Sequence, residues 1–338
     1  MNVLVISPAV AGSRAGNRAT ALRYRKFLLD AGHDCRIEQA FESCAGSVEW
    51  PVDCAIVLHA IRGRYAIAEA RRRGIPLVVV LTGTDYYKSQ FTQPAEFETA
   101  LEAADVLVCL HDLGYRSVPE RFHSKLVVIK QSTAFEEEIS PSRPGESDSG
   151  LTSLIASSSM PIAVIGHLRE EKDPFRAALA AKLLPPESGI QILHAGGAHS
   201  SQWATRAREE MSLTPRYHWL GELSRGDTEQ LLRQAALMII SSVMEGGANI
   251  VSEACALGCP VLASNIDGNM GLLGSDYPGL FEVGDEQALM VQLLRCETDP
   301  TYLTRLTTIC QGLATDFTPQ QEASELLDSV ARACLASK

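Results

Sequence analysis

Positive charge is scarce in this sequence. Its 338 residues include 30 lysines and arginines against 41 aspartates and glutamates, which gives a formal net charge of −11 at pH 7. Proteins that bind nucleic acid through the phosphate backbone need a basic surface, so this balance argues against a nucleic-acid partner. An acidic chain that binds a phosphorylated ligand must instead concentrate its positive charge in a local site.

Long hydrophobic runs and zinc-binding patterns are also missing. The longest apolar runs, over 75–81 and 236–240, are too short to span a bilayer, and the first ten residues lack the basic segment and cleavage site of a secretory signal. We therefore expect a cytoplasmic protein without a stable membrane anchor. The nine cysteines have no zinc-binding spacing, and we expect them to be buried in a reducing compartment.

Two ligand-binding motifs are absent as well. The glycine-rich loop after the first apolar run, over 12–18, is not GxGxxG, and no acidic residue is well placed to bind a ribose after the second run. A dinucleotide site is therefore not expected in the first half. No DxD pair occurs in the chain, so a metal-dependent diphosphate site is not indicated, and we expect neither a metal nor a cofactor.

The sequence does contain short apolar, β-branched runs that alternate with helical stretches. Such runs are typical of strands buried on both faces of a parallel sheet. We predict strands at 2–7, 34–39, 53–58, 76–81, 105–109 and 125–130, and again at 160–166, 189–195, 216–220, 236–241, 260–264 and 279–283. Helices are predicted at 16–31, 65–73, 95–103, 114–121, 173–183, 200–212, 226–235, 248–257, 285–296, 299–315 and 319–336. The repeated strand–helix order predicts an α/β protein with two Rossmann-like domains whose parallel sheets face a central cleft.

The length also fits two domains of about 150 residues each. We expect a first domain over 1–140, a Ser-, Pro- and Gly-rich linker over 141–159, and a second domain over 160–316. The last segment, 317–338, is predicted to be a C-terminal helix that could pack back on the first domain.

Charged and glycine-rich residues follow four strands of the second domain. In GHLREEKDP (166–174), Arg169 and Lys172 would lie near a helix N-terminus and suit a diphosphate, although a charged turn neutralised by neighbouring glutamates is an equal alternative. The segments HAGGAHS (194–200) and WLGEL (219–223) could each be a plain tight turn. In MEGGANIVSEA (244–254), two glutamates flank a glycine turn and could bind sugar hydroxyls in pairs; the alternative is a capped surface helix.

Polar residues also follow three strands of the first domain. A loop with two glycines and two arginines opens a helix, which suits a small anion, although Arg23, Arg25 and Lys26 make a basic surface helix the alternative. Because strand ends of a parallel sheet share one edge, we expect these groups to line one acceptor site. The candidate acceptor-binding residues are Ser13, Arg14, Gly16, Asn17, Arg18, His59, Arg62, Thr82, Gly83, Thr84 and Asp85.

The four segments of the second domain, in this order, resemble the C-terminal domain of GT-B-fold retaining glycosyltransferases of family 4. The resemblance implies that Glu245 contacts the sugar, that the following amides contact sugar and diphosphate, and that Glu253 binds the ribose. Where the family has an arginine, this chain has His167, and Arg169 appears two residues later. The implied catalytic residues are Arg169, Lys172 and Glu245, and the implied donor-binding residues are Gly166, His167, Gly196, Gly197, Leu220, Gly246, Gly247, Ala248, Asn249 and Glu253.

Seven segments together resemble the bacterial selenosugar synthases of the selenoneine pathway. They are AGSRAGNR, LTGTD, GHLREEKDP, HAGGA, RYHWLGEL, MEGGANIVSEA and GLLGSDYPG, and they cover nearly the whole chain. The resemblance implies transfer of a sugar from UDP-N-acetylglucosamine or UDP-glucose to selenophosphate, which gives a 1-selenosugar, UDP and phosphate. Three alternatives stay open: a family 4 enzyme with an oxygen acceptor, a UDP-sugar epimerase or hydrolase, and a non-catalytic UDP-sugar binder.

Overall fold

The computed structural model describes residues 1–8, 16–41, 50–133 and 149–336. Contacts divide the chain into two compact units. The first contains Met1–Ser132, Glu245–Asn249 and Phe317–Lys338, and the second contains Thr133–Met244 and Ile250–Asp316. Each unit holds one parallel sheet. The predicted α/β fold with two parallel sheets is confirmed.

The sheet of the first unit has six strands among the described residues, in the order β2-β1-β3-β4-β5-β6. The central strands consist of uninterrupted apolar residues, and all of these are buried because helices cover both faces. The strands are β1 (Asn2–Ile6), β2 (Asp34–Glu38), β3 (Cys54–Leu58), β4 (Leu77–Val80), β5 (Val106–Cys109) and β6 (Leu126–Val128).

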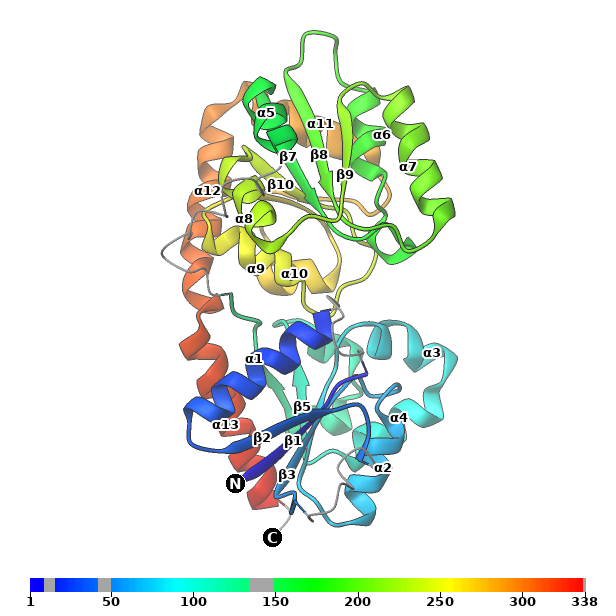
Figure 1. Cartoon of the computed structure of the whole chain (residues 1–338), viewed down its shortest axis with the longest axis vertical. Coiled ribbons are helices and arrows are strands. Elements are labelled where there is room, and N and C mark those ends of the chain that lie inside the picture. Colours follow the sequence, from blue (N-terminus) through cyan, green and yellow to red (C-terminus); the bar gives the residue numbers. More distant parts are fainter. Residues whose placement is uncertain (9–15, 42–49, 134–148, 337–338) are drawn as a thin grey trace. The chain divides into compact units, whose positions relative to one another are not determined.

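Two pairs of helices cover the two faces of this sheet (Figure 1). Helices α1 (Gly16–Asp30) and α13 (Pro319–Ala336) pack on the face that carries Val3 and Val5. Helices α2 (Arg64–Arg72) and α4 (Pro94–Ala103) pack on the face that carries Leu4 and Ile6. The alternation along β1 thus sends successive side chains into two separate cores. The C-terminal helix is therefore a structural part of the first unit.

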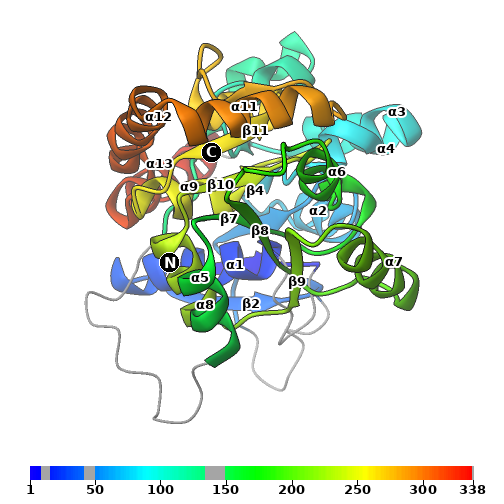
Figure 2. The same cartoon turned by 90° about the horizontal axis from the view of Figure 1, so that it is seen from above.

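The sheet of the second unit has the order β12-β11-β10-β7-β8-β9 among the described residues. Figure 2 shows α6 and α11 on one face of it and α5 and α8 on the other. The strands are β7 (Met160–Ile165), β8 (Ile190–Ala195), β9 (Tyr217–Gly221), β10 (Leu237–Ile240), β11 (Val261–Ser264) and β12 (Leu280–Phe281). The helices are α5 (Ser149–Ser157), α6 (Arg176–Lys182), α7 (Ser201–Leu213), α8 (Arg225–Gln234), α9 (Asn249–Ala256), α10 (Asp267–Leu273), α11 (Glu286–Thr298) and α12 (Pro300–Leu313).

Four segments differ from the sequence prediction, and one of them is 267–273, which forms α10 although no helix was predicted there. The helix predicted over 114–121 is instead a pair of short 3₁₀ segments, η3 (Gly114–Ser117) and η4 (Glu120–Lys125), which Pro119 separates. The range predicted as a linker contains α5, which buries Leu151 and Ile155. The segment after β4, which the prediction left without structure, forms η2 (Asp85–Ser89) and α3 (Gln90–Thr92). Part of the predicted linker, 141–148, lies outside the described residues.

The cysteines of the described chain are buried, apart from the half-buried Cys334. Burial raises the pKa of the Cys35, Cys259 and Cys296 thiols to about 12, so these groups stay protonated and unreactive at neutral pH. Within the described ranges no group of three His, Cys, Asp or Glu side chains could hold a metal ion. None of the helices in those ranges is long and apolar enough to cross a membrane.

Candidate functional site

Two glycine turns meet at the carboxyl edge of the second sheet. Gly166 follows β7 and Gly196 follows the neighbouring strand β8. A side chain at Gly196 would collide with the carbonyl of Gly166, so the two turns approach as closely as they do only because the residue is glycine. The Leu168 amide donates to the Gly197 carbonyl at 2.9 Å. The segments GHLREEKDP and HAGGAHS, which were predicted as separate loops, therefore pack together and are joined by a hydrogen bond.

A buried histidine beneath these turns was not predicted. His194 lies on β8 and is 1% exposed. Its Nε2 lies 3.0 Å from the Gly166 carbonyl oxygen, and its Nδ1 lies 2.8 Å from the Tyr217 hydroxyl. Since a carbonyl only accepts, Nε2 carries the proton and Nδ1 accepts from the tyrosine. Burial lowers the pKa of His194 to about 4, so the ring is neutral. The sequence shows His194 only as a polar residue near the end of the mostly apolar run IQILHA.

The cationic turn after β7 is followed by a helix that starts later than predicted. Arg169 and Lys172 precede α6, which was predicted to begin at 173 and begins at Arg176. The chain makes a 3₁₀ turn over Glu170–Lys172 and then leaves helical geometry because Asp173 has a left-handed backbone with φ of 41°.

The turn is fixed by contacts to the end of β10. The Ser241 hydroxyl donates to the Lys172 carbonyl at 3.2 Å, and the Val243 amide donates to the Glu171 carbonyl at 3.0 Å. The stem of Lys172 lies beside Gly166. The Glu171 carboxylate is 4.0 Å from the Arg169 side chain, the longest separation that still counts as an ion pair. The alternative that a neighbouring glutamate neutralises this turn therefore holds for Arg169, but only weakly.

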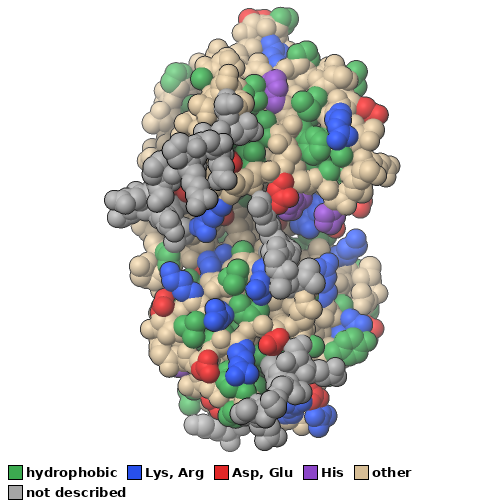
Figure 3. All heavy atoms as spheres, in the orientation of Figure 1, with side chains coloured by type: hydrophobic (Ala, Val, Ile, Leu, Met, Phe, Trp, Pro, Cys, Tyr) green, Lys and Arg blue, Asp and Glu red, His purple; other side chains and the backbone are tan. Residues whose placement is uncertain are grey.

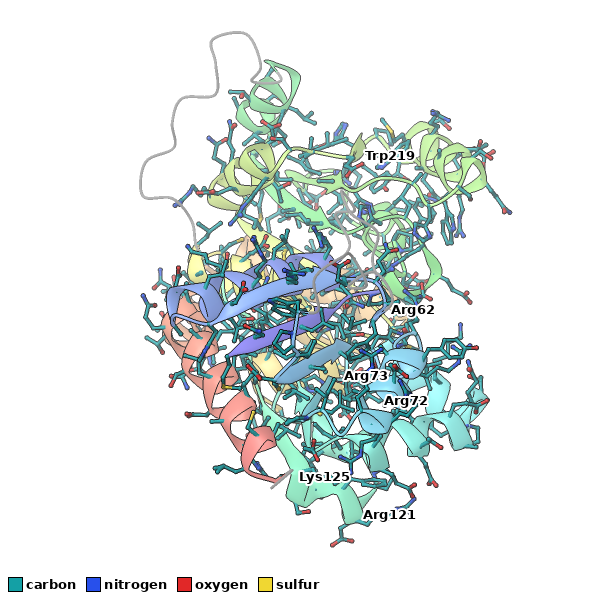
Figure 4. The ribbon with its side chains drawn as sticks, turned by 60° about the horizontal axis from the view of Figure 1, so that its bottom comes forward. Arg62, Arg72, Arg73, Arg121, Lys125 and Trp219 are labelled. Atoms are coloured by element: carbon teal, nitrogen blue, oxygen red, sulfur yellow. The ribbon has the colours of Figure 1, made fainter. Side chains whose placement is uncertain are left out.

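An acidic side chain joins this edge of the sheet. Glu222 follows β9, and its carboxylate and the ring of His167 both lie beside Gly197. Burial lowers the pKa of His167, while the charge of Glu222 opposes the shift. Trp219 of β9, labelled in Figure 4, donates from Nε1 to the Gly196 carbonyl at 2.8 Å. The predicted Leu220 is half-buried in the same strand. Sequence reasoning had considered WLGEL for its glycine and missed this carboxylate.

The glycine turn Glu245–Asn249 groups with the first unit. A side chain at Gly246 would collide with the backbone of Thr82 and Gly83, and the Tyr86 hydroxyl donates to the Gly246 carbonyl at 3.2 Å. Glu245 is 8% exposed. The turn therefore lies directly against the loop after β4, LTGTD, and its close approach requires glycine.

A polar network holds the end of this turn. The Arg23 guanidinium donates to the Asn249 side-chain oxygen at 3.4 Å. With its amide oriented to satisfy its neighbours, Gln131 donates to the same oxygen at 3.0 Å and to the Gly247 carbonyl at 2.9 Å. Helix α9 then begins, and Glu253 follows Asn249 by one turn in the part of α9 that belongs to the second unit. Ala248 is buried at the start of this helix.

Asp85 shapes the loop after β4. Its carboxylate is fully buried and accepts from the backbone amides of Ala60, Thr82, Gly83 and Tyr86 at 2.8–3.2 Å. A carboxylate with this many amide donors stabilises a tight turn and joins it to the end of β3. Asp85, predicted as an acceptor-binding residue, thus acts on the site by fixing the backbone of its neighbours.

A second buried histidine lies near this loop. His111 follows β5, and its Nε2 is 2.8 Å from the hydroxyls of both Tyr86 and Tyr87. Burial raises the pKa of Tyr86 well above its ordinary value, so its hydroxyl stays protonated. His111 supports the tyrosine that holds Gly246. The sequence showed it only as a polar residue just beyond a strand end.

The basic loop before α1 is described only in part. Ser13 and Arg14 lie outside the described residues, while Gly16, Asn17 and Arg18 form the first turn of α1. Arg25 and Lys26 lie on the exposed face of that helix. Figure 3 shows Lys and Arg side chains spread over the face of the first unit that carries α1. The basic surface helix, kept open as an alternative, is therefore present, and the anion site stays a prediction.

Comparison with known proteins agrees with this geometry. Residues 154–308 match the protein family described as Glycosyl transferases group 1. The chain is 23% identical over 287 residues to Glycosyltransferase 1 domain-containing protein 1 of Xenopus tropicalis, covering 79% of this chain and 80% of that protein. It is 25% identical over 252 residues to the UDP-Gal:alpha-D-GlcNAc-diphosphoundecaprenol alpha-1,3-galactosyltransferase of Escherichia coli, covering 72% of this chain and 60% of that protein.

Solved structures share the fold over nearly the whole length. Anabaena HepE in complex with UDP and glucose superposes with a TM-score of 0.72 at 16% identity, covering 98% of this chain and 99% of that chain. Sucrose-phosphate synthase from Thermosynechococcus elongatus superposes with a TM-score of 0.74 at 16% identity, covering both chains completely. The protein thus has the GT-B fold. The match to the family described as Glycosyl transferases group 1 covers residues 154–308, slightly under half of the chain.

Proposed function

We propose that this protein is a UDP-sugar-dependent glycosyltransferase whose acceptor is selenophosphate. The proposal that the protein binds a UDP-sugar donor rests on the arrangement at the carboxyl edge of the second sheet. There, Gly166, Gly196 and Gly197 are partly exposed, and Lys172 lies beside Gly166. Cations beside open turns suit a diphosphate leaving group, whose negative charge grows as its bond to the sugar breaks. The UDP complex of the HepE neighbour supports UDP as the nucleotide.

The acceptor half rests on the resemblance to selenosugar synthases and on the chemistry of the first unit. Selenophosphate is a small anion, and the candidate acceptor residues combine arginines, a helix start and hydroxyl groups. The selenium atom is a soft nucleophile that is ionised at neutral pH, so the reaction does not require a strong general base. Positioning and leaving-group stabilisation then provide most of the catalysis.

The proposed reaction has two steps. Selenium forms a bond to the anomeric carbon while the bond from that carbon to the UDP oxygen breaks, and UDP leaves with the electron pair. Water then cleaves the selenium–phosphorus bond, which releases phosphate and leaves the 1-selenosugar. We assign Lys172 and Arg169 to the departing diphosphate, Glu245 to the sugar and Glu253 to the ribose.

The test is an anaerobic incubation with selenophosphate and either UDP-N-acetylglucosamine or UDP-glucose, followed by mass analysis of the products. A 1-selenosugar, together with equal amounts of UDP and phosphate, supports the proposal. UDP release without any acceptor would identify a hydrolase or epimerase, and tight UDP binding without turnover would identify a binding protein.

A glycosyltransferase with an oxygen acceptor is the second candidate. The names of several curated relatives favour it, among them the E. coli galactosyltransferase and the mycobacterial D-inositol 3-phosphate glycosyltransferase, which is 30% identical over 149 residues. The same incubation with inorganic phosphate and small alcohol acceptors separates the two candidates. Sugar transfer to an alcohol at a rate above that to selenophosphate would select the second.

A further inference from the structure

The proton on the ring of His59 has a defined position. The Arg62 backbone N–H donates to His59 Nδ1 at 3.2 Å, so Nδ1 carries no proton and the neutral ring is protonated at Nε2. Burial lowers the pKa of His59, which keeps the ring neutral. The Asp85 carboxylate is 3.8 Å from Nδ1, too far for a hydrogen bond, and already accepts from several backbone amides.

This tautomer determines what Thr84 can do. His59 Nε2 lies 2.9 Å from Thr84 Oγ1, and because Nε2 carries the hydrogen, the threonine hydroxyl is the acceptor in this bond. The hydrogen of the Thr84 hydroxyl is then available to another partner. Thr84 is half-exposed at the end of β4, whereas His59 is 3% exposed. The buried His59 ring therefore orients the Thr84 hydroxyl so that its hydrogen is available at the surface.

A cation lies at the same edge of the sheet. Arg62 follows β3, the neighbour of β4, and its side chain is exposed. The other arginines labelled in Figure 4 lie elsewhere on the unit and are paired, Arg72 with Glu69 and Arg121 with Glu98. Among the ion pairs of the described residues, none involves the Arg62 guanidinium. Its charge is close enough to disfavour protonation of His59.

We propose that the Thr84 hydroxyl, oriented by His59, and the Arg62 guanidinium bind an oxygen of the phosphoryl group of the acceptor, and that His59 is a positioning residue. The proposal rests on the proposed function, because it concerns the acceptor of that reaction. A hydroxyl donor beside a guanidinium favours an oxyanion over a neutral alcohol. The two residues would thereby select an anionic acceptor.

The kinetic test compares variants that differ by one donor. Thr84→Val removes the hydroxyl and should raise the KM for selenophosphate about tenfold or more, the effect of one hydrogen bond to a charged group. The KM for the UDP-sugar should stay unchanged. Thr84→Ser should restore the wild-type KM. His59→Gln keeps an N–H donor and should be milder than His59→Phe, which loses it. Thr99→Val, at an exposed threonine of α4, is the matched control.

A binding experiment separates this proposal from the proposed function. Calorimetric titration with monothiophosphate and with inorganic phosphate needs no turnover, so it remains decisive if selenophosphate is not a substrate. We expect Thr84→Val and Arg62→Gln to weaken binding of monothiophosphate while UDP affinity is retained. Equal affinity in wild type and Thr84→Val, or no binding of either anion by the wild type, would overturn the proposal.

Discussion

At the scale of single residues, the buried ring of His194 holds the Gly166 carbonyl at the candidate donor site of the second unit. Its folded pKa is about 4, below the value of 6.5 expected for the unfolded chain. Between these two values the unfolded state binds more protons than the folded state, so stability falls as the pH decreases through this window. The loss between pH 7 and pH 5 should be about 2 kcal/mol. Urea unfolding at pH 7, 6 and 5 measures it.

The matched variants are His194→Gln and His199→Gln, the latter at an exposed histidine of the same unit. His194→Gln should be less stable at pH 7 and should lose less stability on acidification. His199→Gln should follow the wild type. If the two variants had the same pH dependence, the buried ring would not be the titrating group.

Glu253 is assigned to the ribose hydroxyls by resemblance, and it lies half-buried on α9. Glu253→Gln removes the charge from hydrogen bonds worth about 1.5–3 kcal/mol each, so UDP should bind about tenfold to a hundredfold more weakly. Isothermal titration with UDP measures the effect. Glu187→Gln, at an exposed position of the same unit, should bind UDP like the wild type. Unchanged affinity in Glu253→Gln would remove this residue from the donor site.

Lys172 is assigned to the charge that develops on the leaving diphosphate. An interaction that strengthens only in the transition state lowers kcat when it is removed, while substrate binding changes less. Lys172→Ala should therefore reduce kcat by about a hundredfold, the usual effect of losing one such group. Steady-state kinetics with the UDP-sugar varied would show it, and Lys182→Ala on α6 is the control. A change confined to KM would assign Lys172 to ground-state binding.

At the scale of elements, α13 is joined to α1 and to the end of β6 by one buried carboxylate. Glu322 of α13 is 1% exposed, pairs with Arg23 of α1 at 3.0 Å and accepts from the Ser132 amide at 2.8 Å. Glu322→Ala leaves these donors without a partner and should lower stability by about 3 kcal/mol. Chemical denaturation measures this value. Glu69→Ala on the exposed side of α2 should change stability little, since its arginine partners are exposed.

The elements also show what a sequence can predict. The strand predictions succeeded because runs such as LVVV and LMII are buried on both faces, which demands uninterrupted apolar residues. The predicted helix over 114–121 failed because Pro119 divides it, and the helix predicted to begin at 173 begins at Arg176 because Asp173 takes a left-handed backbone. Local backbone choices of this kind depend on tertiary contacts that no pattern in the chain records.

In the candidate site, too, the sequence predicts positions along strands but not the tertiary contacts that fix them. Residues at strand ends, such as His59 and Thr84, were predictable because parallel strands bring their carboxyl ends to one edge. Their supports were not predictable. His111 and His194 act through partners 23 to 28 residues away in the chain, and Glu222 acts through packing against a glycine. Sequence reasoning therefore found the loops of the site and missed the side chains that hold them.

At the scale of the whole molecule, the first unit is built from both ends of the chain. Helix α13 contributes Leu326, Val330 and Ala333 to the core beneath β1 and β3. The first unit therefore completes its core only with residues that follow the whole second unit. Contacts between residues so distant in sequence have a high entropic cost in folding, which the buried apolar surface of α13 must offset.

Two leucines of α13 test this arrangement. Leu326 is fully buried and Leu335 is 70% exposed. Leu326→Ala should destabilise the protein by about 2–5 kcal/mol, because it leaves a cavity in the core of the first unit. Leu335→Ala should have little effect. Urea unfolding followed by circular dichroism compares them. Equal stability of the two variants would mean that α13 does not complete the core in solution.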